Sequence, residues 1–393
     1  MADIVRAHEA DLVCASDRTP SLLERRVLRD IARCRTAALG GHVEKCDRCS
    51  HIRVSYNSCR NRHCPKCQGS AREKWLSERA GELLPVQYFH VVFTIPHEVA
   101  AISLQNRKAI YSILFETSAK TVRQVAADPR HLGAEVGFLS VLHTWGQNLE
   151  HHPHVHLIVP GGGLSKDRDT WIPARDGFFL SVKVLARLFR GKFLAALKRL
   201  HRTGKLHLGG DLASLENPEK FREFMMSLYE KEWFVYSKPP FGGPEHVLKY
   251  LSRYTHRVAI SNSRIVSFED GEVSFLWKDY AHGCKRRIMT LSAVEFLRRF
   301  LTHVLPPGFV RIRHYGFLSN RHRSGMIELC RKLLDVKEGS SPTKSAESST
   351  STDRAEVDPP CPVCKSGRML LVMTLAEGEE LPEHLHVARV DTS

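Results

Sequence analysis

The spacing of the cysteines constrains this chain more than any other feature of its sequence. Seven of the eleven cysteines lie before residue 70, and five of these fall in the segment CDRCSHIRVSYNSCRNRHCPKC. Two Cys-x2-Cys pairs in this segment are separated by fourteen residues, which is the spacing of a zinc ribbon with four thiolates around one ion. We therefore predict one structural zinc site with the ligands Cys46, Cys49, Cys64 and Cys67. Cys59 could replace one of them or serve a second site, and reduced structural cysteines are the alternative.

Basic residues clearly outnumber acidic ones. Lys and Arg total 58 against 43 for Asp and Glu, which gives a formal charge of +15. Such a balance favours a polyanionic partner, although a generally basic protein is the alternative. The zinc segment itself carries Arg60, Arg62 and Lys66, and a basic zinc ribbon suits contact with DNA. We interpret these three side chains as candidate DNA contacts.

Neither a membrane span nor an export signal is recognisable in the sequence. No run of about 18 apolar residues occurs, and the opening MADIVRAHEADLV lacks the basic and then apolar layout of a signal peptide. We therefore expect a cytoplasmic protein with no membrane partner. Because thiols stay reduced in that compartment, the clustered cysteines indicate metal binding rather than a disulfide framework.

A histidine cluster stands at the start of an apolar run, in HHPHVHLIVPGGG, which begins at His151. Alternate side chains of a strand share one face, so His154 and His156 should project together and could chelate a divalent ion. His143 lies in the preceding strand-like run, and hairpin pairing could bring it alongside as a third ligand. We expect His151 and His152, in the turn, to face solvent or DNA. Ordinary strand histidines are the alternative reading.

Two tyrosines lie four residues apart in EHVLKYLSRYTHRVAISNSRI, a predicted helix that leads into a strand. Tyr250 and Tyr254 would be neighbours on one helical face, with Arg253 and Arg257 close by as candidate DNA contacts. A tyrosine hydroxyl can attack a phosphodiester when a metal polarises the phosphate and cations hold the developing charge. Core packing of the two rings is the alternative.

Two further features lie toward the C-terminus. In FVRIRHYGFLSNRHR, Arg311 and Arg313 stand close to aromatic residues, so they could hold phosphates while rings stack on bases, or the segment could close a sheet. Beyond a Ser-rich stretch, Cys361-x2-Cys364 is half of a zinc site. The other half could come from His384 and His386.

The secondary-structure pattern indicates an α+β fold. VQYFHVVFTIP reads as a buried strand, a long amphipathic helix follows over about residues 97–127, and two strand-like runs form a hairpin. A second hairpin should turn at Asp270-Gly271. We predict an N-terminal zinc ribbon and a central antiparallel sheet with helices on one face, which presents the histidine pair toward the tyrosine helix.

These motifs together resemble those of a known family. HPHVHLIVPGGG resembles the His-hydrophobic-His motif of the HUH endonuclease superfamily, which includes rolling-circle replication proteins, conjugative relaxases and some transposases. The strings YNSCRNRHCPKCQ, FRGKFLAAL, YLSRYTHRVAISN and IRHYGFLSNRHR, in this order, are similar to those of the rolling-circle insertion-sequence transposases of the IS91 family. The resemblance covers nearly the whole chain to about residue 335.

The resemblance implies a fold, a set of site residues and a reaction. The sheet would be ferredoxin-like or RRM-like, His154 and His156 would be the HUH pair, and Tyr250 and Tyr254 would be the nucleophiles. The third ligand varies across the superfamily, and His143 is our expectation. Zinc would be structural and the catalytic ion Mg or Mn. A tyrosine would cut single-stranded or melted DNA at an element end, through a 5′-phosphotyrosine intermediate, and join it to a target.

The resemblance and the composition together divide the chain into four parts. We expect an N-terminal helix and zinc-binding domain over residues 1–84 and an HUH catalytic domain over residues 85–335. A disordered linker over residues 336–360 and a tail with a possible small metal site over residues 361–393 would follow.

Three other functions remain open at this point. An HUH replication initiator or relaxase would use the same chemistry. A non-catalytic, zinc-dependent DNA-binding regulator would bind DNA without becoming attached to it. A metal-dependent hydrolase would cut DNA with water and leave no protein-linked product.

Overall fold

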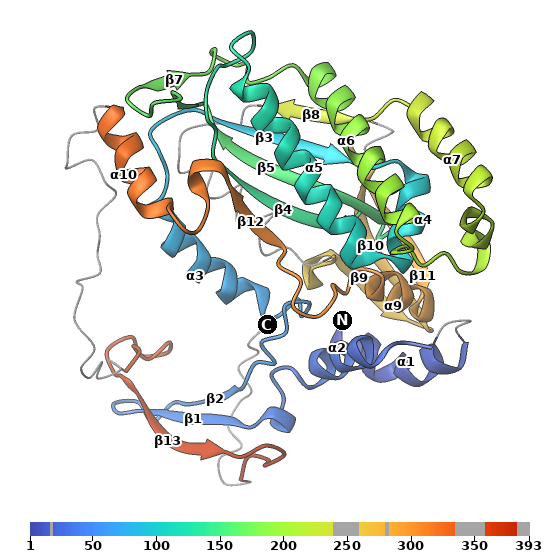
Figure 1. Cartoon of the computed structure of the whole chain (residues 1–393). Helices are drawn as coiled ribbons and strands as arrows, with labels where there is room; N and C mark the ends of the chain where they lie inside the picture. Colours follow the sequence, from blue (N-terminus) through green and yellow to red (C-terminus); the bar gives the residue numbers. More distant parts are fainter. Residues whose placement is uncertain (16–18, 239–258, 280–282, 335–357, 383–393) are drawn as a thin grey trace.

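The computed structural model describes five stretches of the chain. They are residues 1–15, 19–238, 259–279, 283–334 and 358–382. Within them, helices combine with four β-sheets, which confirms the predicted α+β class (Figure 1). None of the helices in these stretches is both long and apolar enough to cross a membrane.

The largest sheet has five antiparallel strands in the order β12-β4-β5-β3-β8. Its strands are β3 (Tyr88–Thr94), β4 (Phe138–Trp145), β5 (His151–Pro160), β8 (Val235–Lys238) and β12 (Ile312–Tyr315). β3 is rich in aromatic and β-branched residues, which suit a strand with neighbours on both sides, and it pairs with both β5 and β8. The predicted central antiparallel sheet and its β4–β5 hairpin are therefore confirmed.

Helices cover one face of this sheet (Figure 1). They are α4 (His97–Gln105), α5 (Arg107–Ala127), α6 (Val182–Arg202) and α7 (Pro218–Glu230). Phe93, Leu142 and Val155 point to this side and are fully buried in the main core of the protein. The Phe93 ring meets Phe189 of α6, with 4.9 Å between the ring centroids. This packing fixes which strand residues face the opposite way.

The single helix expected over residues 97–127 is two helices, α4 and α5, with a break at Asn106. The Asn106 side chain donates to the carbonyl of His207 at 2.7 Å and accepts from the His207 backbone N–H at 2.7 Å. Asparagine readily satisfies backbone groups in this way, in competition with the helix. The apolar periodicity of the sequence continues through Asn106, so the sequence pattern did not reveal the break.

The second face of the central sheet is covered in part by α3 (Gln68–Ala80). Trp75 of α3 packs there against a small cluster that includes Tyr88, Leu139 and Ile158. The predicted helices on one face are thus present, and α3 on the other face is an addition that the prediction did not include. The apolar residues of 68–80 do not form a clear helical stripe, so the sequence does not show which surface this helix packs against.

A second structural unit is formed by two segments that are distant in the sequence, one at the N-terminus and one that ends near residue 304. It contains α1 (Ala2–Ala15), α2 (Leu22–Arg33), the three-stranded sheet β9 (Ile265–Glu269), β10 (Glu272–Asp279) and β11 (Lys285–Ser292), and α9 (Ala293–Leu301). Residues of both segments share one core, with Ile4, Leu28, Phe275 and Phe296 fully buried in it. The hairpin turn at Asp270 and Gly271 is confirmed, and both residues have positive φ. The first two helices thus pack on residues that the sequence prediction assigned to another domain.

A third sheet joins the N-terminal and C-terminal parts of the chain. β1 (Gly41–Cys46) pairs with β2 (Ile52–Tyr56) on one side and with β13 (Met369–Leu375) on the other. Figure 1 shows β13 alongside this hairpin, away from the central sheet. The expected linker lies almost wholly outside the described residues. The remaining elements are β6 (Gly162–Leu164), β7 (Trp171–Pro173), α10 (Arg323–Leu333) and the 3₁₀ turns Ala37–Leu39, Gly210–Glu216, Asn262–Arg264 and Gly316–Leu318.

Candidate functional site

Three histidines converge on the face of the central sheet that lies opposite α5 and α6. His154 and His156 are two residues apart on β5, and Val155 between them enters the main core on the other side. His143 of β4 is the direct partner of His154 across the hairpin. Potential ligand atoms of all three lie within 4.8 Å of one another. The common direction predicted for these side chains is confirmed, and we call this group the histidine site.

The protein itself orients two of these rings. The Nε2 atom of His90 lies 2.7 Å from Nδ1 of His156, and His154 Nδ1 lies 2.7 Å from the carbonyl oxygen of His152. Hydrogen bonds at Nδ1 fix the ring orientation and favour Nε2 as the ligand atom. The His143 ring stacks on Trp145, with 4.7 Å between centroids and 16° between planes. The site is therefore largely ordered by contacts within the protein.

His90 is a residue that the sequence interpretation missed. It lies in the middle of β3, and alternation along that strand places it on the same face as His156, which belongs to the neighbouring strand. Burial lowers the pKa of His90 to about 4, so its ring is neutral near pH 7. A neutral ring can exchange one hydrogen bond with His156 without adding charge to the site.

His151 does not face solvent as expected. Its Nε2 atom lies 2.8 Å from the Ser103 hydroxyl, and its ring stacks at 6.2 Å on His303. Burial lowers the pKa of His151 to about 2. A register shift in the hairpin between His143 and Trp145 turns this end of β5 toward the protein interior. His152 is exposed, as expected.

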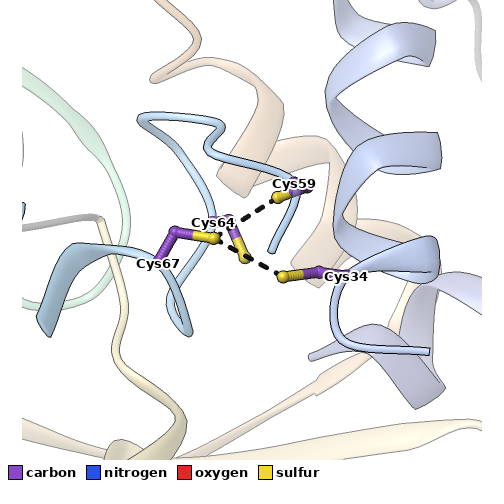
Figure 2. A group of neighbouring side chains, drawn as sticks. All are labelled: Cys34, Cys59, Cys64 and Cys67. Atoms are coloured by element: carbon purple, nitrogen blue, oxygen red, sulfur yellow. Dashed lines mark hydrogen bonds between the residues drawn. The ribbon is translucent and has the colours of Figure 1, made fainter. Parts of the chain in front are cut away.

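The cysteines form two clusters of four rather than one ribbon. Figure 2 shows the first, which we call the inner cysteine cluster and which consists of Cys34, Cys59, Cys64 and Cys67. The sulfur of Cys67 lies 3.5 Å from that of Cys34 and 3.5 Å from that of Cys59. Cys34 follows α2 and Cys67 caps the start of α3, so the cluster joins two helices and the loop between them. Hydrogen bonds among the thiols lower the pKa of Cys67 and raise those of Cys59 and Cys64, because the four groups share their protons.

The second group, the outer cysteine cluster, consists of Cys46, Cys49, Cys361 and Cys364. The predicted zinc site of Cys46, Cys49, Cys64 and Cys67 was therefore wrong in its grouping. Cys46 and Cys49 occupy the turn of the β1–β2 hairpin, whereas Cys59 follows β2 after the chain has run back along the hairpin. At about 3.3 Å per residue, these strands of six and five residues hold the two pairs at opposite ends of the hairpin. Cys34, which the prediction left out, completes the inner cluster.

The predicted DNA-contacting side chains have different environments. Arg62 is bound to the protein itself, because its guanidinium donates to the carbonyls of Phe309 at 2.7 Å and Pro306 at 3.0 Å. Its role at DNA stays a prediction. Burial and the nearby Arg62 lower the pKa of Arg311 to about 10. Arg313 stacks over the Phe115 ring at 4.3 Å.

The other predicted site residues either are accessible to solvent or lie outside the described stretches. Arg60 is exposed and Lys66 is half-buried at the edge of the inner cysteine cluster. The residues outside the described stretches are Tyr250, Tyr254, Arg253, Arg257, His384 and His386. The roles assigned to the tyrosines and arginines stay predictions. In the described part of the chain, Cys361 and Cys364 have Cys46 and Cys49 as neighbours in place of the two expected histidines.

Two family models match the chain. One, described as a transposase zinc-binding domain, matches residues 4–95, and the other, described as a putative transposase, matches residues 137–325. The first span contains the inner cysteine cluster, and the second contains the histidine site together with both candidate tyrosines.

Two relatives extend these matches over most of the chain. The chain is 52% identical over 377 residues to the putative transposase y4qJ of Sinorhizobium fredii, which covers 95% of this chain and 94% of the relative. It is 27% identical over 314 residues to the transposase for insertion sequence element IS801 of Pseudomonas savastanoi pv. phaseolicola, which covers 76% of this chain and 73% of that relative. No solved structure matches the chain.

Proposed function

The chain belongs to the IS91 family of transposases with an N-terminal zinc-binding domain, and we propose that it acts by cutting and rejoining single DNA strands. The observation that carries this proposal is the convergence of His143, His154 and His156 on one face of the central sheet. This arrangement is what the HUH resemblance requires of a catalytic metal site. A purely DNA-binding protein would have no use for it.

The donor set of the histidine site suits a divalent ion. Three imidazoles within 4.8 Å of one another supply neutral nitrogen ligands, and partners at Nδ1 hold two of the rings. We propose Mg or Mn as the ion, with His143 as the third ligand. An ion held by these three residues would supply Lewis-acid polarisation of the scissile phosphate and would stabilise the charge that develops in the reaction.

The nucleophile in this proposal is a tyrosine hydroxyl. The Tyr250 or Tyr254 hydroxyl gives up its proton and its oxygen forms a bond to phosphorus. The bond from phosphorus to the 3′ oxygen breaks, and the 3′ oxygen takes up a proton, so no net proton is gained or lost. The product is a 5′-phosphotyrosine and a free 3′-hydroxyl, so the energy of the phosphodiester is kept for rejoining. The second tyrosine can then accept the other element end or the target strand, in a rolling-circle reaction.

Strand cleavage on a denaturing gel tests the proposal. The purified chain is incubated with Mn²⁺ and labelled single-stranded DNA that carries the end of its own element. We expect a slowly migrating protein–DNA band that weakens in Tyr250→Phe or Tyr254→Phe and disappears in the double variant. Tyr229→Phe, at an exposed tyrosine of α7, is the matched control and should keep the band.

The other outcomes separate the alternative functions. Cleavage without a covalent band, unchanged in the double tyrosine variant, would indicate a metal-dependent hydrolase. Binding without cleavage at an authentic end would indicate a DNA-binding regulator. A covalent band formed only at a plasmid origin or transfer origin would indicate a replication initiator or relaxase.

A further inference from the structure

We propose that the outer cysteine cluster binds a second zinc ion, which joins the C-terminal segment of the chain to the N-terminal zinc-binding domain. Cys46 and Cys49 come from the β1–β2 turn, and Cys361 and Cys364 come from the segment before β13. The family model for the zinc-binding domain ends at residue 95, so it contains only the first of these pairs. The inference concerns the architecture of the protein and is independent of the cleavage chemistry.

The distances between sulfur atoms match a tetrahedral tetrathiolate site. The Sγ atoms of Cys46 and Cys364 are 3.7 Å apart, and those of Cys49 and Cys361 are also 3.7 Å apart. Zn–S bonds of about 2.3 Å at tetrahedral angles place sulfurs about 3.8 Å from one another. A disulfide would require about 2.05 Å. All four sulfurs lie within 4.8 Å of one another, so one ion can reach them all.

The two halves of the cluster have the same local backbone construction. The backbone N–H of Cys46 donates to the His51 carbonyl at 2.8 Å, and that of Cys361 donates to the Gly367 carbonyl at 2.8 Å. The residue after the second cysteine is left-handed in both, with φ 57° at Ser50 and φ 56° at Lys365. Each half is therefore a closed turn with both thiols on the same side.

Backbone N–H groups also point at the sulfurs. Cys46 Sγ accepts from the backbone N–H groups of Arg48 and Cys49 at 3.4 Å each, and Cys364 Sγ accepts from that of Gly367 at 3.3 Å. Hydrogen bonds to sulfur favour the thiolate and orient it, as partners of metal ligands do. This arrangement is present in both halves, although they are 312 residues apart between Cys49 and Cys361.

The two turns also fit closely against each other. A Cβ atom on Gly367 would lie 2.5 Å from the Cys46 sulfur, so only glycine allows this approach. The backbone N–H of Arg368 donates to the Asp47 carboxylate at 2.9 Å, and the N–H of Asp47 donates to the Arg368 carbonyl at 3.1 Å. These contacts bring both pairs of thiols to one point.

The strand that follows lacks a large apolar anchor of its own. β13 pairs with β1 over six residue pairs, but its side chains Leu370, Leu371 and Val372 are between 43% and 62% exposed. Only Met369 and Leu375 at its two ends are buried. Because such a strand gains little from burial, an ion can supply the binding energy that holds it in place.

Zinc content of the full-length protein tests this proposal. We expect two zinc ions per chain by elemental analysis, and one after the paired change Cys361→Ser with Cys364→Ser. The paired change Cys46→Ser with Cys49→Ser should also leave one ion, and all four changes together should still leave one. Cys14→Ser with Cys284→Ser, at two exposed cysteines outside the clusters, is the control and should keep two.

Measurements on the unaltered chain keep the proposal testable if the variants fail to fold. Titration of metal-free protein with Co²⁺ should give tetrathiolate absorption that grows to two equivalents. One zinc ion per wild-type chain, or two ions in the Cys361 and Cys364 variant, would overturn the proposal. So would four missing thiols in denatured, unreduced protein, since that count would mean that the outer cluster is a pair of disulfides.

Discussion

The histidine site and the cysteine clusters are held together in different ways. The histidines lie on adjacent strands of a five-stranded sheet, whose opposite face is buried in the main core. Hydrogen bonds within the protein already orient His154 and His156. The cysteines instead come from helix ends, loops and distant chain segments.

The difference teaches what each ion would contribute. A scaffold that forms without the ion can lose the ion and keep its shape. Removal of the ion from the histidine site should therefore abolish activity without lowering the stability of the protein. A site whose ligands meet because of the ion couples binding to folding. Removing metal from the two kinds of site should therefore affect two different measurements.

The largest effect is expected for His154→Ala or His156→Ala. Each removes a proposed ligand, and loss of several kcal/mol of transition-state stabilisation slows cleavage by about a hundredfold or more. The melting temperature and the affinity for single-stranded DNA should stay nearly unchanged. Cleavage rates, thermal unfolding and fluorescence anisotropy check the three parts separately.

His152→Ala is the matched control for these variants, because His152 is an exposed neighbour on the same strand. The variant loses the ring that lies 5.3 Å from the His154 ring but keeps the backbone carbonyl that holds His154 Nδ1. Cleavage by His154→Ala at the wild-type rate would rule out the histidine site as the catalytic centre. A large loss of melting temperature would instead mean that its scaffold depends on the ion.

Next in size is the loss of the inner cysteine cluster. Cys64→Ser should remove one zinc ion and destabilise the protein by several kcal/mol, because Cys64 is buried in the core shared by α1, α2 and α9. We expect a lower melting temperature and weaker recognition of the element end. Unchanged zinc content would count against this cluster as a zinc site, and Cys14→Ser serves as the control.

The outer cysteine cluster should show a smaller and more local effect. Its buried members, Cys46 and Cys361, pack with Met369 in a small cluster of their own, apart from the large cores. Cys361→Ser should therefore speed amide exchange along β13 while the main unfolding transition moves little. An equal loss of melting temperature for Cys361→Ser and Cys64→Ser would erase the distinction between the two clusters.

Strand alternation made the histidine pair predictable. His154 and His156 are local to one strand, and the hairpin to His143 is short, so local patterns were enough to bring these three residues together. The α+β class and the central antiparallel sheet followed from the same local patterns.

Contacts between distant segments were not predictable in this way. Spacing alone grouped the cysteines wrongly, because the β1–β2 hairpin carries one pair away from the other. The partner of the Cys361 and Cys364 pair depends on a contact across more than 300 residues. The carbonyls that accept from Arg62, those of residues 306 and 309, are also distant in the sequence, so nothing local reveals these bonds.

A moderate effect on metal affinity is expected from changes at His90. Such changes test whether hydrogen bonds within the protein orient the histidine site before the ion binds. His90→Phe keeps a ring but removes the hydrogen bond to His156, and loss of such a partner typically weakens metal affinity 10- to 100-fold. Cleavage should then need more Mn²⁺ and recover at saturation. His90→Gln, which can still hydrogen-bond, should lie between wild type and His90→Phe, and an unchanged Mn²⁺ dependence would exclude this role.

The smallest effect concerns the pH range in which the scaffold stays intact. His303 is buried, its Nε2–H donates to the Leu149 carbonyl at 3.0 Å, and burial lowers its pKa from 6.5 to about 4. Because the folded pKa is below the unfolded value, its contribution is complete above about pH 6.5 and is lost as the pH falls toward 4. The positive charge of Arg107 on α5 opposes protonation of this ring as well, while His151 of β5 stacks on it as a neutral ring.

At pH 5.5 this single group should cost about 1 kcal/mol of folding free energy relative to pH 7. Urea unfolding of wild type and His303→Gln at both pH values measures the difference, and the variant should lose part of the pH dependence. His131→Gln, at a half-buried histidine in the loop after α5, is the control and should keep it. If wild type were equally stable at both values, buried neutral histidines would not limit the scaffold, and acid could be used to strip the ion from the histidine site without unfolding the sheet.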